Sequence, residues 1–230
     1  MNVRENARAM GVPPDSPLMS SLLSDSLTAI QSVRCLGRAV HVGVATRIVE
    51  LLLTEGVIFP GMTYGSAYSG VDTFAAAVDL VLAGNWTYAY ASEPLLYARR
   101  ALLRAWGCRG LDEGGCYYDA AGADAIAAPR TDMEVYTGQC GPYSDSDRDH
   151  DEDDQLTSLA HLCQSLEHAR RSAPAVIVVE NVHKPSVVGP VTCFLSKFSG
   201  YRMRHGPLCA LAVGGSHAKR TRHYWVLTKV

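Results

Sequence analysis

Apolar and polar positions along this chain follow the periods of strands and helices in turn. The expected strands are Met62–Tyr68, Thr87–Ser92, Cys116–Tyr118, Met133–Thr137 and Ala175–Val179, with a closing pair at Tyr201–Val213 and His223–Lys229. The expected helices among them are Asp72–Leu82, Pro94–Trp106 and Gln155–Arg171. Because strands and helices alternate, the pattern predicts an α/β fold with a doubly wound sheet. The Ala175–Val179 run is apolar without interruption, which is typical of a parallel strand covered on both faces.

The segment before the first strand has a helical pattern. Residues 25–55 carry apolar side chains at helical spacing, with Gly37 as a candidate interruption and Gly56 as a stop signal. We expect residues 1–24 to be a loose leader and residues 25–230 to form one domain. Within that domain, residues 25–56 form a helical segment that precedes the catalytic sheet of residues 57–230.

Composition narrows the class of protein. With 230 residues, 47% hydrophobic and 19% charged, the chain suits one globular domain. No stretch approaches the roughly 20 apolar residues of a membrane span, and residues 1–17 lack an apolar signal core. Seven scattered cysteines without a C-x-x-C pair argue against a disulfide framework or a zinc site. We therefore expect no bound metal and a reducing intracellular compartment, which would be the nucleus in a eukaryote and the cytoplasm for a bacterial or viral protein.

A cysteine and a carboxyl group are the first candidates for chemistry. The run YTGQCGPYS places Cys140 on a turn directly after Met133–Thr137, and Glu180 and Asn181 end the apolar run AVIVVENV. The carboxyl ends of parallel strands meet at one crevice, where such sheets bind ligands. A nucleophile beside a proton donor suggests covalent catalysis on an electron-poor ring. The alternatives are a merely buried thiol for Cys140 and a salt bridge or helix cap for Glu180, whose pKa burial should raise.

Three other strand ends suit a nucleotide. Gly70, in the run YSGVDTF, allows backbone amides to approach a ligand at a helix N-terminus, or forms a simple turn. Glu93 ends the run YASE, where an acid suits ribose hydroxyls or a helix dipole. Asp119 follows the third strand and suits an adenine amino group or a loop cap.

Two charged segments flank these candidates. In HAKRTRH, Arg220 and Arg222 point the same way on an extended chain, so they suit an anion or a carbonyl oxygen, unless they only form a solvated basic surface. The run DSDRDHDEDD at Asp145–Asp154 places seven carboxylates after Cys140. It is either a solvated loop or an autoinhibitory cover for the two arginines. The net charge of −2 is low for a duplex-binding domain, so contact with nucleic acid would need a local patch or a partner chain.

Taken together, these motifs resemble the DNA (cytosine-5)-methyltransferase family. Gln139-Cys140-Gly141-Pro142-Tyr143-Ser144 resembles its catalytic loop, Glu180-Asn181-Val182 its Glu-Asn-Val motif, and Arg220-Thr221-Arg222 its Arg-x-Arg motif. The resemblance implies a Rossmann-like S-adenosylmethionine-dependent methyltransferase sheet with an antiparallel closing strand. The implied catalytic residues are Cys140, Glu180, Arg220 and Arg222, and the implied substrate contacts are Pro142, Ser144 and Asn181. The implied cofactor contacts are Tyr68, Ser69, Gly70, Val71, Asp72, Thr73, Glu93, Pro94, Asp119, Ala120, Gly138, Arg38, Ala39 and Val40.

One family motif is displaced. Leu36–Leu53 resembles a Gly-Asn-Ala/Ser-Val segment and helix that normally lie near the C-terminus, so the chain resembles a circular permutant. Such a change moves a connection rather than a contact. The sequence departs from the family at Arg38 for Asn, Asp72 for Gly, Gln139 for Pro, Gly141 for Gln and Ala218 for Gln. No target-recognition segment is evident after Arg222, so we expect a partner chain or a second copy to supply one.

The resemblance implies a specific reaction. The expected activity is transfer of a methyl group from S-adenosylmethionine to carbon 5 of cytosine in DNA, through a covalent Cys140 adduct. Two alternatives remain open. One is a methyltransferase-like regulatory or binding subunit with little or no activity, and the other is an RNA cytosine-5 methyltransferase. None of the three involves a membrane.

Overall fold

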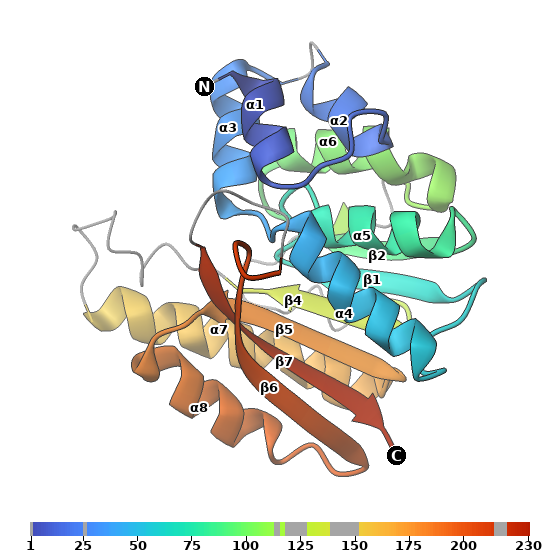
Figure 1. Ribbon diagram of the computed structural model, residues 1–230. Coiled ribbons are helices and arrows are strands. Elements are labelled where there is room, and N and C mark those ends of the chain that lie inside the picture. Colours follow the sequence, from blue (N-terminus) through green and yellow to red (C-terminus); the bar gives the residue numbers. More distant parts are fainter. Residues whose placement is uncertain (1, 25–26, 113–115, 118–127, 139–151, 214–219) are drawn as a thin grey trace.

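The fold is built on one mixed β-sheet between two helical layers. The computed structural model describes residues 2–24, 27–112, 116–117, 128–138, 152–213 and 220–230. Within these residues the sheet has seven strands in the order β3-β2-β1-β4-β5-β7-β6 (Figure 1). The strands are β1 (Thr63–Ala67), β2 (Thr87–Ser92), β3 (Cys116–Tyr117), β4 (Met133–Thr137), β5 (Val176–Val182), β6 (Tyr201–Cys209) and β7 (Thr221–Lys229). The first five are parallel, and β7 runs antiparallel to both β5 and β6. The predicted doubly wound sheet with an antiparallel closing strand is confirmed.

Helices cover both faces, as the unbroken apolar pattern of β5 requires. Val176 and Val178 join a core with α4 (Val42–Thr54), α5 (Thr73–Leu82) and α6 (Leu96–Trp106). Ile177 and Val179 point the other way, into a second core with α7 (Glu152–Ser172) and α8 (Pro185–Leu195). The side chains of one strand therefore alternate between two buried layers.

The expected loose leader is wrong. Residues 1–24 contain α1 (Val3–Ala9) and α2 (Pro17–Leu22), which lie with α3 (Ala29–Arg38) near α6 (Figure 1). Asn2 and Glu5 form a capping box on α1, and Ser16 caps α2. The Ser21 hydroxyl of α2 donates 2.8 Å to the Ala101 carbonyl of α6. The helices are too short to show a periodic pattern, and packing stabilises them.

Other boundaries also shift. The expected helix over residues 25–55 is two helices, and its break falls at residues 39–41, just after Gly37, where His41 caps α4. Strand β5 continues to Val182, so Glu180 and Asn181 lie inside it. Helix α8 was not predicted, because Gly189 and Pro190 weaken its helical signal. Strands β2 and β4 have the predicted bounds.

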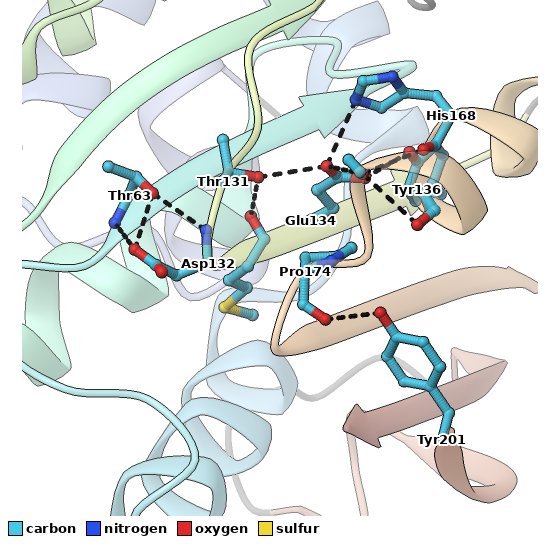
Figure 2. Close-up of polar contacts among 11 residues, drawn as sticks. Thr63, Thr131, Asp132, Glu134, Tyr136, His168, Pro174 and Tyr201 are labelled. Carbon is cyan, nitrogen blue, oxygen red and sulfur yellow. Dashed lines mark hydrogen bonds and ion pairs between the residues drawn. The ribbon is translucent and has the colours of Figure 1, made fainter. Parts of the chain in front are cut away.

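A buried polar network fixes β4 against its neighbours (Figure 2). The carboxylate of Glu134 has no exposed surface and accepts hydrogen bonds from the Tyr136 hydroxyl at 2.7 Å and the Ser172 hydroxyl at 2.8 Å. At the start of the strand, Asp132 Oδ2 accepts from both the backbone amide and the hydroxyl of Thr63, each at 2.7 Å. These contacts join β4 to α7 and β1, and so set the position of its carboxyl end.

Candidate active site

The carboxyl ends of β1, β4 and β5 lie next to one another, at the point where the strand order reverses. Ala67 pairs with Tyr136, and Thr137 pairs with Glu180. The Thr137 hydroxyl also donates 2.8 Å to the Tyr68 carbonyl, which joins the end of β4 to the turn after β1. Such a switch point is where open α/β sheets bind ligands.

The turn after β1 meets the acid at the end of β2. The Gly70 amide donates 2.7 Å to Glu93 Oε2, and the Leu95 amide donates 2.8 Å to Glu93 Oε1. Glu93 is 5% exposed. Tyr68 and Asp72, which are not glycines, have left-handed φ values of 57° and 49°, a conformation that costs about 1 kcal/mol or more. The two elements expected to hold a nucleotide are thus in direct contact, in a strained turn at the N-terminus of α5.

Asp72 points into the core instead of toward the edge of the sheet. Its carboxylate accepts hydrogen bonds from the hydroxyls of Tyr64, Ser66 and Tyr88, and from the Ala75 amide at the start of α5. Burial raises the pKa of Asp72, although these hydrogen bonds oppose the shift. Asp72 therefore fixes the turn through hydrogen bonds on its buried side. Its three hydroxyl partners could not be predicted from the sequence, because they come from two separate strands.

The neighbouring residues of this turn are mostly buried. Ser69 is 7% exposed and its amide donates 3.1 Å to the Ser92 carbonyl, Val71 is 1% exposed, and Pro94 is exposed. The Thr73 hydroxyl donates 2.7 Å to the Val40 carbonyl. That bond joins the start of α5 to the connection between α3 and α4.

Arg220 binds the same connection. Its guanidinium donates 2.8 Å to the Gly37 carbonyl and 2.9 Å to the Ala39 carbonyl. Arg38 ends α3, and its side chain lies outside the described part of the structure. Since α4 also packs against α5, the segment that resembles a displaced motif borders the turn after β1. Arg220 is therefore bound to the backbone, whereas Arg222 faces a carboxylate.

Glu180 and Arg222 form a pair on the α4 side of the sheet. Arg222 Nε lies 3.3 Å from Glu180 Oε1, and the two side chains are 21% and 6% exposed. Burial raises the pKa of Glu180, and the charges of Arg222 and Arg220 partly oppose that shift. Tyr224 pairs with Glu180 across the strands, and its pKa is raised by burial and by the nearby carboxylate. A carboxyl group with a raised pKa can act as a proton donor.

Asn181 lies on the opposite face, against the exit of β4. Its Oδ1 accepts 2.7 Å from the Val182 amide, and the residue is 2% exposed. A Cβ added to Gly138 would lie 3.0 Å from Asn181 Nδ2 and 3.1 Å from Leu162 Cδ2. Gly138 therefore allows the chain to leave β4 in close contact with Asn181.

The structure brings together Glu93 with the Gly70 turn, and Glu180 with Arg222. Five predicted site residues lie outside the described part of the structure: Cys140, Asp119, Ala120, Pro142 and Ser144. Most of the acidic run lies outside it as well. Across the described ranges, no group of three or more His, Cys, Asp or Glu residues is arranged to hold a metal ion. In the same ranges, no helix has the length and apolar character needed to cross a membrane.

Comparison with known proteins identifies the fold. No family model and no curated protein matches the chain. Among solved structures, NSun6 from Pyrococcus horikoshii with SFG has a TM-score of 0.59 at 10% identity, covering 82% of this chain and 51% of that one. TrmN from Thermus thermophilus has a TM-score of 0.50 at 15% identity, with 93% and 52% covered. Precorrin 8W decarboxylase from Methanobacterium thermoautotrophicum has 0.50 at 16%, with 81% and 90% covered.

These likenesses place the chain in a structural class. It has the Rossmann-like methyltransferase fold, with the strand order and antiparallel β7 described above. The chain spans about half the length of NSun6 and TrmN.

Proposed function

We propose that this protein is a methyltransferase that transfers a methyl group from S-adenosylmethionine to carbon 5 of cytosine in DNA. The observation that carries the proposal is the Glu180–Arg222 pair on β5 and β7, at the same edge of the sheet as the turn that holds Glu93. A buried carboxyl with a raised pKa can hold the N3 edge of a pyrimidine and share a proton with it. The reaction itself is inferred from the resemblance of the sequence motifs to the cytosine-5 methyltransferase family.

The cofactor pocket in this proposal is formed by the Gly70 turn, Glu93 and the α5 N-terminus. Glu93 accepts from two backbone amides, and a carboxylate is the kind of acceptor that binds ribose hydroxyls. When bound, S-adenosylmethionine supplies an electrophilic methyl group. Thr73 and Arg220 hold the α3–α4 connection at the border of this pocket. That contact supports a circularly permuted arrangement, in which the connection takes the place of the displaced motif.

Cys140 is the nucleophile in the proposed reaction. It follows Gly138 by two residues in the sequence. Gly138 itself lies against Asn181, one residue from Glu180. The Cys140 thiolate forms a bond to carbon 6 while Glu180 shares its proton with N3. Carbon 5 becomes nucleophilic and is methylated, and loss of its proton with departure of Cys140 restores the ring. Arg222 holds Glu180 in place, and its second role in the proposal is to be the cation that favours a thiolate.

The substrate base must leave the helix stack to reach these groups, at a cost of a few kcal/mol in a duplex. A structured RNA can present an unstacked base without that cost. Because the net charge of −2 gives little general attraction for phosphate, we propose that a partner chain or second copy contributes target recognition. RNA methylation and a purely regulatory role are the other outcomes of the test.

The test is methyl transfer from tritiated S-adenosylmethionine to DNA or to tRNA, by the native protein and by Cys140→Ala. We expect incorporation into DNA, a loss of at least about 10³-fold in Cys140→Ala, and unchanged affinity for S-adenosylhomocysteine by calorimetry. The matched control is Cys108→Ala, an exposed cysteine in the 3₁₀ turn after α6, which should keep full activity. Labelling of tRNA alone would identify the RNA enzyme. Cofactor binding with no transfer to either acid would identify a binding module.

A further inference from the structure

Three histidine rings form a line on the α8 side of the sheet, away from the Glu180–Arg222 pair. His183 follows β5, His205 belongs to β6 and His223 belongs to β7. His183 Nδ1 lies 3.1 Å from His223 Nδ1, and His205 Nδ1 lies 3.1 Å from His223 Nε2. His223 is 3% exposed, whereas both outer residues are exposed. Both nitrogens of the central ring are therefore engaged by another imidazole.

The number of protons that this arrangement can hold follows from hydrogen-bond chemistry. Each nitrogen–nitrogen contact needs one proton between the two atoms, since two lone pairs or two N–H groups facing each other repel. The two contacts hold two protons, and the Nε2 atoms of His183 and His205 can hold two more. Three neutral rings carry three protons, so the cluster accepts one additional proton with both contacts intact. A second additional proton has to enter a contact that already has one, and so breaks it.

We propose that His183, His223 and His205 form an acid-sensitive latch, which holds the end of β5 to β7 and β6 until the cluster takes up a second additional proton. The latch joins the elements that carry the candidate active site, because Asn181 pairs with His223 and Arg222 precedes it. Its opening would separate the β5–α8 junction from β7. This inference does not depend on the proposed methyl transfer.

The surroundings of His223 also disfavour the protonated form of its ring. Burial lowers the pKa of His223 to about 4, and the neighbouring His205 and His183 add to that shift. The Trp225 ring lies 4.4 Å away, and His183 is stacked at 5.3 Å with an interplanar angle of 12°. On β7, Arg222 points to the other face with Glu180, since neighbouring strand residues alternate. Within the described residues, the titratable groups that act on His223 are thus the two outer histidines.

The free energy of unfolding depends on the protonation of this cluster, and it decreases in acid. The pKa of His223 is lower in the folded protein than the ordinary value of 6.5. The folded state therefore binds fewer protons between pH 6.5 and about 4, and stability falls as the pH falls through that window.

Nitrogen-15 NMR of histidine-labelled protein between pH 8 and 4 tests the proton count directly. We expect the three rings to titrate as one coupled group. The first step should leave the nitrogen shifts typical of N–H···N contacts, and the second should remove them and shift the signals of residues 181–185. Three independent titrations near pH 6.5, with no later step, would overturn the latch.

Thermal unfolding provides a second test of the proposal. Between pH 6.5 and 4.5, the Tm of the native protein should fall by about 5–10 °C more than that of His223→Phe, which keeps a ring but no titrating nitrogen. His205→Gln, at an exposed position, should reduce the fall as well if His223→Phe does not fold. His161→Gln on α7 is the matched control and should fall as the native protein does. Equal falls in all four proteins would contradict the proposal.

Discussion

Replacing Arg222 with methionine removes the guanidinium that faces Glu180 while keeping an apolar stem of similar length. In the native protein Arg222 Nε lies 3.3 Å from Glu180 Oε1, and the carboxylate side chain is only 6% exposed. Two unit charges at this distance attract by about 5 kcal/mol at an effective dielectric constant of 20. The cost of removing both from water cancels much of that attraction, and loss of one partner from a buried pair usually costs about 3–5 kcal/mol. Because Arg222 is partly exposed, we expect about 2–3 kcal/mol at pH 8.

The pH dependence makes this expectation specific. Burial already raises the pKa of Glu180, and Arg222 opposes that shift. Without Arg222 the pKa rises further, so Glu180 in the variant is protonated at a higher pH than in the native protein. A neutral carboxyl does not need the guanidinium, and the loss of stability should therefore shrink as the pH falls from 8 to 5.

Urea unfolding at pH 8 and pH 5 measures the effect in a double-mutant cycle. Arg222→Met should cost little in a Glu180→Gln background, because no carboxylate is left unpaired. Arg202→Met, at an exposed position on β6, is the control and should change stability by less than about 0.5 kcal/mol. An equal loss at both pH values, or an undiminished loss in the Glu180→Gln background, would refute the assigned role of the pair.

Three other substitutions test how the site is positioned. Arg220→Met should lower the free energy of unfolding by about 2–3 kcal/mol, because it removes two charge-assisted bonds to backbone carbonyls, and limited proteolysis should then cut between α3 and α4. Gly65→Ala should cost about 3 kcal/mol by urea unfolding, since its Cβ would overlap the buried ring of Tyr90. Gly138→Ala should reduce methyl transfer at least about tenfold with a small change in Tm, because it displaces the Asn181 amide.

The parts of this fold that could be predicted from sequence are those with a local pattern. Strands β2 and β4 had strong β-type runs, and their bounds were correct. The motifs placed Glu180 and Arg222 in one expected site, but their contact at 3.3 Å was not predicted. Helix α8 could not be predicted, since Gly189 and Pro190 lower its propensity and its packing on β5 compensates.

The remaining features depend on tertiary contacts that leave no local signal. The sequence predicts that Arg220 and Arg222 act together on one ligand. In the structure, Arg220 instead binds backbone carbonyls more than 180 positions earlier in the chain. The hydroxyl partners of Asp72 come from β1 and β2, and the three rings of the histidine latch come from β6, β7 and the residue that follows β5. Such groups meet only after the sheet has formed.

The most direct test of the account is covalent capture of the protein on DNA that contains 5-fluorocytosine, in the presence of S-adenosylmethionine. The fluorine cannot leave as a proton does, so the adduct persists. We expect intact-mass spectrometry to detect a one-to-one complex, and peptide mapping to place the bond on Cys140. The complex should be absent in Cys140→Ala and strongly reduced in Glu180→Gln. A protein that binds the cofactor and the DNA but forms no adduct, or forms one at another cysteine, would contradict the proposed chemistry.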